Sequence, residues 1–200
     1  MGSGAIPIVL VFLLVFLTWQ TIYSSNRDLV RAKEWGDLAR RALPFGALAL
    51  MASSLFVVQG YREGWVLITW MFVSGALIVL ASVLSIPSTE RRANRAFRSG
   101  NFQKAAELYR ELAEEKPLAR HHAYLGAALG ASERYEESVD ASTEAIKKDP
   151  KYGLAYYNRA LVLRRMGKKS RAVKDLKQAL EADLPRRFRS AARKMLEELA

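Results

Sequence analysis

Cysteine is absent from this chain of 200 residues, and histidine occurs only twice. Without cysteine there is no disulfide scaffold, no thiol nucleophile and no metal site built on thiolates. The two histidines, His121 and His122, are neighbours, so on a helix they point to different sides and make a poor pair of metal ligands. A glycine-rich phosphate loop is also missing. We therefore expect no enzymatic activity, no cofactor and no metal.

Charge is scarce in the first 86 residues, which hold 6 of the 31 lysines and arginines and 4 of the 20 aspartates and glutamates. A membrane span needs about 20 apolar residues, and three apolar stretches predict spans at about residues 5–23, 43–59 and 65–86. Proline suits the first turn of a helix, so Pro44 is expected to open the second span. Aromatic residues lie at the ends of the stretches, as in an interfacial belt: Trp19, Tyr23, Tyr61 and Trp65.

Two alternatives to membrane spans are weaker. A cleaved signal peptide would have a basic segment before the first stretch and a small-x-small cleavage site after it, and the sequence has neither. A soluble hairpin built from the second and third stretches would have too few polar residues to cover it. No ionisable side chain lies inside any stretch, which argues against a pump or a transporter.

Basic residues predict the orientation of the spans, because cytoplasmic loops are enriched in lysine and arginine. Two segments are basic, the loop 24–42 and the segment after the third span: Arg27, Arg31, Lys33, Arg40, Arg41, Arg91, Arg92, Arg95 and Arg98. Three spans put both on one side, so we expect the N-terminus outside and residues 87–200 in the cytosol. The excess of arginine over lysine, 20 to 11, is typical of GC-rich bacterial genomes and favours a bacterial cell membrane.

The loop 24–42 is itself amphipathic at helical spacing. We expect either a basic helix on the inner membrane surface, where each cation beside anionic lipid gains about 1 kcal/mol, or a plain cytosolic connector.

The remaining residues, 87–200, repeat with a period of about 34 residues. Pro117, Pro150 and Pro185 are 33 and 35 residues apart. Other positions recur in step with them, in three ladders: Ala93, Gly126 and Ala160; Ala105, Ser138 and Ala172; Leu112, Ala145 and Ala179. Small residues let two helices cross closely, so the pattern predicts helix–turn–helix repeats at about 88–118, 119–152 and 153–185.

The middle repeat carries Leu125-Gly126, Tyr135, Ala145 and Asp149-Pro150, and on these residues the segment resembles the tetratricopeptide repeat (TPR) family. The sequence departs from the family pattern at Thr89 and Arg92, so the first helix of the first repeat either continues the third span or is frayed. Two further departures lie in the middle repeat. Ser138 replaces the usual alanine, and Glu133 replaces the glycine of the turn.

A last helix follows Pro185. Its apolar residues fall three and four apart: Phe188, Ala191, Ala192, Met195, Leu196 and Leu199. We interpret residues 186–200 as a helix that caps the repeats; the alternative is a basic helix for a membrane surface or nucleic acid. The sequence thus predicts an all-α chain, with a three-helix transmembrane segment (1–86) followed by a TPR α-solenoid of three repeats and a cap (87–200).

The TPR resemblance implies that partners bind in a concave groove lined by the first helix of each repeat. The candidate partner-binding residues are Asn94, Arg98, Arg120, Tyr124, Tyr157, Asn158, Arg164 and Arg165. Such a groove is basic, and we expect Tyr157 and Arg164 to face outward in it. The family's carboxylate clamp is matched by Asn94 and Asn158, but Glu90 stands where a basic clamp residue is expected.

We therefore expect a membrane-anchored scaffold or adaptor that recruits a protein partner with an acidic and apolar segment, and that contacts lipid through its spans. One alternative is a regulatory or structural subunit of a larger membrane complex, held by its spans. Another is binding of nucleic acid or anionic lipid by the basic surface, since residues 87–200 carry 25 basic and 16 acidic side chains. Nucleic acid is disfavoured because the acidic residues are well mixed in.

Overall fold

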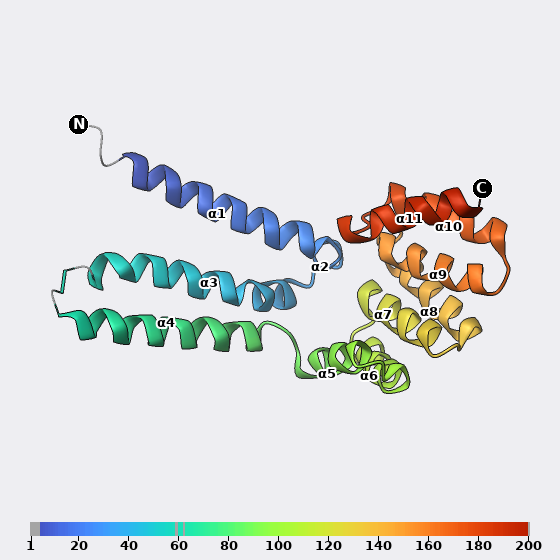
Figure 1. The fold of residues 1–200 in the computed structure, drawn as a ribbon, viewed down its shortest axis with the longest axis horizontal. Coiled ribbons are helices and arrows are strands. Elements are labelled where there is room, and N and C mark those ends of the chain that lie inside the picture. Colours follow the sequence, from blue (N-terminus) through green and yellow to red (C-terminus); the bar gives the residue numbers. More distant parts are fainter. Residues whose placement is uncertain (1–4, 59, 62, 200) are drawn as a thin grey trace. The chain divides into compact units, whose positions relative to one another are not determined.

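The computed structural model describes residues 5–58, 60–61 and 63–199, and within them every regular element is an α-helix (Figure 1). The helices are α1 (Ala5–Ser25), α2 (Arg27–Arg31), α3 (Trp35–Val58), α4 (Gly64–Leu84), α5 (Ser88–Arg98), α6 (Phe102–Glu115), α7 (Ala119–Ala131), α8 (Tyr135–Lys148), α9 (Gly153–Arg165), α10 (Lys169–Glu181) and α11 (Arg186–Leu199). They form two compact units, Met1–Pro87 and Ser88–Ala200, which are described separately.

The N-terminal unit has a small core where α1, α2 and α3 meet. Ile22, Leu29 and Leu38 are buried there. The chain turns between α2 and α3 at Lys33, whose φ of 58° lies in the left-handed region. The backbone N–H of Glu34 closes this turn by donating to the carbonyl of Leu29 at 2.9 Å.

We expected the second apolar helix to start at Pro44, and this prediction is wrong. Helix α3 begins at Trp35 and contains Pro44 in its interior, so Arg40 and Arg41 share a helix with the apolar stretch. The expected loop 24–42 is accordingly α2, a turn and the first turns of α3. Proline removes only the hydrogen bond to the carbonyl four residues earlier. The residues before Pro44 are good helix formers, and they propagate the helix through that loss.

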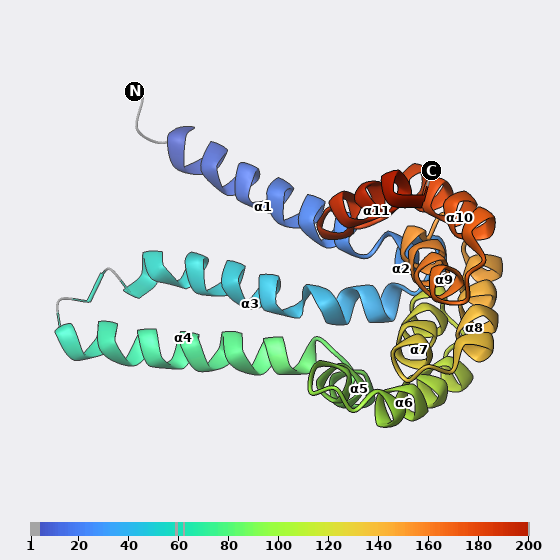
Figure 2. The same cartoon turned by 45° about the vertical axis from the view of Figure 1, so that its right-hand side comes forward.

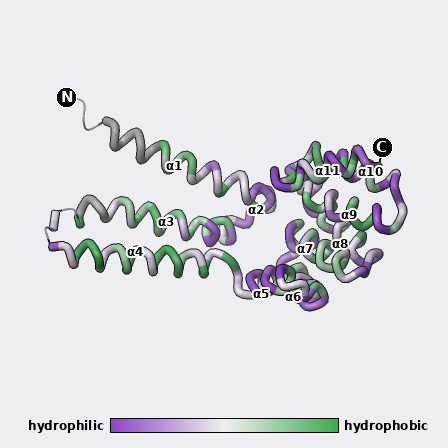
Figure 3. The backbone as a smooth tube through the Cα atoms, in the orientation of Figure 1, coloured by the Kyte–Doolittle hydropathy of each residue, from purple (hydrophilic) through white to green (hydrophobic). Residues whose placement is uncertain are grey.

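One helix in the described residues, α4, is long and apolar enough to cross a membrane by length and composition. It is apolar along nearly its whole length (Figure 3), and Phe72 is 76% exposed while only Ser74 is buried. The second expected span lies in α3, which also carries Asp37, Arg40 and Arg41. The first expected span lies in α1, where many side chains fall outside the described residues. The described part of the chain therefore contains one candidate span, where the sequence predicted three.

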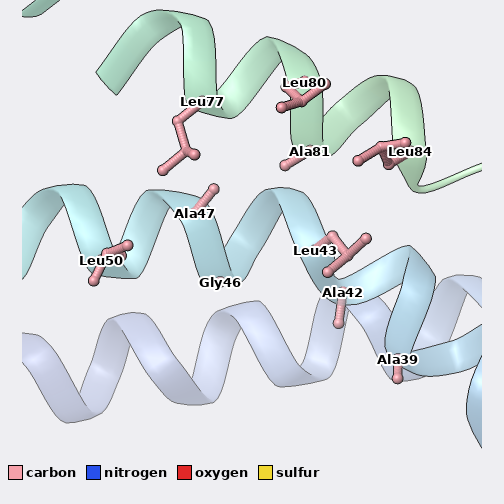
Figure 4. A pocket seen from close by; sticks show the side chains of 10 residues that line it. All are labelled: Ala39, Ala42, Leu43, Gly46, Ala47, Leu50, Leu77, Leu80, Ala81 and Leu84. Atoms are coloured by element: carbon pink, nitrogen blue, oxygen red, sulfur yellow. The ribbon is translucent and has the colours of Figure 1, made fainter. Parts of the chain in front are cut away.

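Helices α3 and α4 form a hairpin (Figure 1). The indole Nε1 of Trp70 donates to Ser54 Oγ at 2.9 Å, which ties the two helices together inside an apolar surface. An open apolar recess of about 420 Å³ lies between them (Figure 4), lined by Ala39, Ala42, Leu43, Gly46, Ala47, Leu50, Leu77, Leu80, Ala81 and Leu84.

The C-terminal unit is a curved stack of three helix pairs, α5/α6, α7/α8 and α9/α10, followed by α11 (Figure 2). In Figure 2, α7 and α9 lie on the inner side of the curve and α6, α8 and α10 on the outer side. Helix α4 ends at Leu84 and helix α5 begins at Ser88, with Pro87 between them. The first helix of the first repeat is therefore not a continuation of the apolar helix.

Small residues make each pair possible. Gly126 of α7 lies so close to α8 that an added Cβ would stand 3.2 Å from the carbonyl oxygen of Ser138. Ser138 Oγ donates to the Gly126 carbonyl at 2.6 Å, so the serine that replaces the usual alanine is buried and satisfied. The equivalent residues of the other pairs, Ala105 and Ala172, have no exposed surface.

Helix α11 covers the last pair. Phe188, Ala192, Met195, Leu196 and Leu199 pack with residues of α9 and α10, whereas Ala191 is exposed. This burial of the apolar stripe is the arrangement of a cap, since a terminal repeat otherwise leaves its apolar side open to water.

The turns inside the helix pairs need a left-handed residue. Gly100 and Gly167 supply it with φ values of 79° and 73°, and Glu133 occupies the same place in the middle pair with a φ of 63°. A residue with a Cβ is strained in this conformation, by about 1 to 2 kcal/mol.

Replacing Glu133 with glycine relieves this strain, although glycine also loses more backbone entropy on folding. We expect Glu133→Gly to raise the free energy of unfolding of residues 88–200 by about 0.5 to 1 kcal/mol, measured by urea denaturation. The matched control Gly167→Ala places a Cβ in the equivalent turn and should lower it by about 1 kcal/mol. A loss of stability in Glu133→Gly would contradict the strain.

Candidate partner-binding surface

The inner helices α5, α7 and α9 carry all the residues expected to bind a partner. Asn94 and Arg98 lie on α5, Arg120 and Tyr124 on α7, and the rest on α9: Tyr157, Asn158, Arg164 and Arg165. The stack places α7 and α9 side by side (Figure 2), whereas α5 packs on α6. The eight side chains differ in exposure and in their contacts.

Asn94 holds the first helix pair together. The hydroxyl of Tyr109, on α6, donates to Asn94 Oδ1 at 2.8 Å. Tyr109 is 3% exposed. Burial raises the pKa of this phenol well above its usual range, and the neighbouring Tyr124 and Glu90 raise it further, while Arg98 opposes the shift. The phenol therefore stays protonated and keeps the asparagine occupied.

Asn158 and Arg165 hold successive pairs together. Asn158 is buried, and its Nδ2 donates to the carbonyl of Ala123 on α7 at 2.9 Å. Arg165 Nη1 donates to the carbonyl of Gly130, near the end of the same helix, at 3.3 Å. Both bonds span 35 residues, about one repeat. The two asparagines proposed for a carboxylate clamp thus have structural hydrogen bonds.

Tyr157 was expected to face outward, and this is wrong. It is 8% exposed, and its ring lies 5.4 Å from the ring of Phe188 on α11. Burial raises the pKa of the phenol. Phe97, Tyr124 and Tyr156 are the half-buried aromatic residues of α5, α7 and α9. Of these only Tyr124 was among the predicted binding residues, and its ring lies 5.5 Å from that of Tyr109.

The arginines form a smaller basic surface than expected. Arg120 is 4% exposed, whereas Arg98, Arg164 and Arg165 are exposed. Arg164 Nη1 stands 3.4 Å from Glu198 Oε2 on α11, which neutralises part of its charge. A weak ion pair between exposed side chains contributes little to stability, so Arg164 can exchange Glu198 for an acidic group of a partner.

Sequence analysis missed the strongest polar contact of the unit. Arg159 on α9 donates twice to Asp175 on α10, from Nε to Oδ2 at 2.7 Å and from Nη2 to Oδ1 at 2.8 Å, and its Nη1 donates to Thr143 Oγ1 on α8 at 2.9 Å. The hydrogen bonds that Arg159 donates to Asp175 raise the pKa of Arg159. An arginine in the middle of α9 and the only aspartate of α10, 16 residues later, were the available signal.

The histidines have no catalytic neighbours. His121 Nδ1 lies 2.8 Å from the carbonyl oxygen of Lys116, so it donates to the end of α6. Burial lowers the pKa of His122, with Lys148 adding to the effect. In the described part of the chain no three His, Asp or Glu side chains are grouped so that they can hold a metal ion.

Comparisons with known proteins identify the repeats. Residues 91–153 and 142–174 match models of the tetratricopeptide repeat. The TPR repeat-containing thioredoxin TTL4 of Arabidopsis thaliana is 32% identical over 119 residues, which is 58% of this chain and 17% of that protein. A DnaJ homolog subfamily C member 7 homolog of Dictyostelium discoideum is 29% identical over 115 residues, 55% of this chain and 21% of that protein. The chain thus matches about a fifth of these relatives.

Solved structures share the fold. The translocator chaperone SycD of Yersinia enterocolitica has a TM-score of 0.52 at 22% identity, over 56% of this chain and 88% of that chain. The Sgt2 TPR domain of Aspergillus fumigatus has a TM-score of 0.51 at 21% identity, over 57% and 78%. The C-terminal unit therefore carries TPR repeats in an all-helical solenoid, as the resemblance implied, and this fold is typical of protein–protein interaction.

Breaking the Arg159–Asp175 pair should destabilise the unit. Asp175→Ala leaves a largely buried guanidinium without its carboxylate, and we expect a loss of about 2 to 3 kcal/mol in the free energy of unfolding. The double variant Arg159→Leu, Asp175→Leu removes both charges and should lose less than about 1 kcal/mol. Urea denaturation of residues 88–200 measures both, and equal losses would show that the pair itself is not the cause.

Proposed function

We propose that the chain is a membrane-anchored adaptor. Its TPR unit binds a partner protein, and its N-terminal unit holds that complex at the cytosolic face of a bacterial cell membrane. The observation that carries the proposal is the joining of two unlike units: a stack of TPR repeats and a hairpin whose helix α4 exposes apolar side chains along most of its length.

Partner binding is supported by the nature of the repeats. A TPR structure of the same fold, SycD, was solved with a peptide of the translocator YopD; its TM-score is 0.51 at 20% identity. We infer that this chain also takes a peptide segment of a protein. The exposed Arg98 and Arg164 favour acidic residues in that segment, and the half-buried Tyr124 offers an aromatic surface for an apolar side chain.

Membrane anchoring is supported by exposure and by charge. Phe72 and Ile68 of α4 are 76% and 57% exposed, and water does not favour such a surface. Basic residues gather in α2 and the start of α3 and in α5, the segments that flank the apolar helices: Arg27, Arg31, Lys33, Arg40, Arg41, Arg92 and Arg95. With α1 and the apolar part of α3 as further spans beside α4, the N-terminus is outside and the repeats are in the cytosol.

A second candidate function is a subunit of a larger membrane complex. The recess between α3 and α4 favours it, because a wholly apolar recess of about 420 Å³ has room for side chains of another helix.

Topology reporters test the anchor. Fusions after Ala200 and after Ala42 should report the cytosol, and an insertion between Tyr61 and Gly64 should report the outside. The reason is that an odd number of spans places the segments after the first and third spans on the same side. A C-terminal fusion that reports the outside would contradict the adaptor as proposed, and a fully soluble chain would contradict the anchor.

Charge reversal tests the binding surface. The partner is isolated by affinity purification of the intact chain in mild detergent and identified by mass spectrometry. We expect Arg98→Glu and Arg164→Glu to weaken its binding at low salt and less at high salt, because exposed charges act mainly through long-range attraction.

The matched control is Lys104→Glu, which makes the same charge change on the exposed side of α6. Calorimetric titration of the purified pair should show unchanged affinity for this variant. If all three variants bound the partner as tightly as the parent chain does, the inner helices would not be the binding site.

A further inference from the structure

Helix α10 presents cations that no acidic side chain of the described residues neutralises. Five side chains at and after its start are exposed, and in the described residues none of them has an ion pair or a side-chain hydrogen bond: Lys168, Lys169, Arg171, Lys174 and Lys177. We call these five residues the α10 basic face. The only aspartate of the helix, Asp175, is buried and bound to Arg159.

The other two outer helices carry the opposite charge. Exposed glutamates dominate α6, at Glu107, Glu111, Glu114 and Glu115, and the exposed residues of α8 include Glu136, Glu137 and Asp140. The balance of charge therefore differs along the outer side of the stack. On α6 and α8 the exposed acidic residues outnumber the exposed Lys104, Lys147 and Lys148, whereas the α10 basic face has five exposed cations and Glu181 is the one exposed acidic residue of that helix.

The placement of these cations works against helix stability. The N-terminal end of a helix is the positive end of its dipole and favours acidic side chains. Helix α8 follows this rule with Glu136 and Glu137 in its first turn. Helix α10 has no acidic residue in its first turn, where Lys169 and Arg171 lie, and Lys168 is its N-cap. Folding of α10 does not require the positive charge of these residues. Their presence is better explained by binding of an anionic ligand.

The chemistry of the neighbouring side chains selects the ligand. The other exposed residues of α10 are Ser170, Gln178 and Glu181, and Glu181 accepts a hydrogen bond from Gln178 at the end of the helix. The surface has no aromatic ring on which a nucleobase can stack and no apolar anchor for a peptide. Lipid headgroups need neither, because clustered lysines and arginines alone attract an anionic membrane surface.

We propose that the α10 basic face binds the anionic headgroups of a lipid bilayer. The inference is independent of the partner-binding surface on the inner helices. It rests on the proposed anchor in one respect only, that the anchor keeps the TPR unit next to a bilayer. Each cation at the surface strengthens the attraction about fivefold, so the face as a whole is sufficient for a stable, salt-sensitive contact.

Lysine accessibility in the full-length chain tests this proposal. The chain is placed in nanodiscs of phosphatidylcholine alone or with phosphatidylglycerol, treated with a water-soluble acetylating reagent and analysed by mass spectrometry. We expect acetylation of Lys168, Lys169, Lys174 and Lys177 to slow severalfold only in the anionic discs and to recover at high salt. Lys104, on α6, is the internal control and should react equally in both.

Matched variants separate binding from folding. Arg171→Glu with Lys174→Glu should abolish the protection of the remaining lysines without lowering Tm, since an acidic residue suits the first turn of α10. The control Lys147→Glu with Lys148→Glu makes the same change in net charge on α8, another outer helix, and should keep the protection.

Other outcomes decide against the proposal. Equal acetylation in both kinds of disc overturns it, and so does protection that survives Arg171→Glu with Lys174→Glu. Protection in neutral discs by an added oligonucleotide, with none from phosphatidylglycerol, makes the face a nucleic-acid site instead. Protection by inorganic phosphate alone makes it a site for free anions. Extraction of the chain from the discs by alkaline carbonate shows separately whether the anchor fails.

Discussion

The TPR unit depends on the close approach of its paired helices at small residues. Gly126 and Gly130 of α7 face Ser138 and Ser142 of α8, and an added Cβ on Gly126 would stand 3.2 Å from a backbone oxygen of α8. This contact fixes the spacing of each pair. Ala105 and Ala172, which are fully buried, occupy the equivalent places in the other two pairs. Successive pairs then stack closely enough for a side chain to reach the backbone of the preceding pair, as Asn158 reaches the carbonyl of Ala123.

Many polar side chains of the inner helices make contacts within the stack and are not available to a ligand. Asn94 is bound by Tyr109, Asn158 by a backbone carbonyl, and Tyr157 is covered by Phe188. A solenoid buries only one side of each repeat against its neighbours, so polar contacts between helices add to a modest apolar core. These contacts leave a smaller surface for ligands. On the inner helices the exposed charge lies mainly at Arg98, Arg164 and Arg165.

Sequence reasoning succeeded where one residue type has one steric role. Small residues at a period of about 34 predicted the TPR repeats, because only small side chains fit a close helix crossing. It failed where the outcome depends on a partner element. Tyr157 has the pattern of an exposed residue until α11 covers it, and Arg159 and Asp175 are 16 residues apart with no local sign of pairing. Pro44 misled because proline also occurs inside helices when the flanking residues carry the helix past one missing hydrogen bond.

Charge on the outer helices carries information that charge on the inner helices does not. An inner side chain can be polar because it joins two repeats, as Asn158 does. Some exposed side chains of the outer helices also join two repeats, as Glu137 on α8 does with Arg110 on α6 at 3.4 Å. The exposed cations from Lys168 to Lys177 have no such contact among the described residues, so the fold does not determine the sign of their charge. Without selection on these positions we would expect cations and anions to be mixed. The exposed charges from Lys168 to Lys177 are all basic, even in the first turn of α10, where acidic side chains would stabilise the helix. A charge that opposes the local energetics of its own helix is better explained by an external ligand than by folding, and the inner and outer sides of one small solenoid can then serve two different partners.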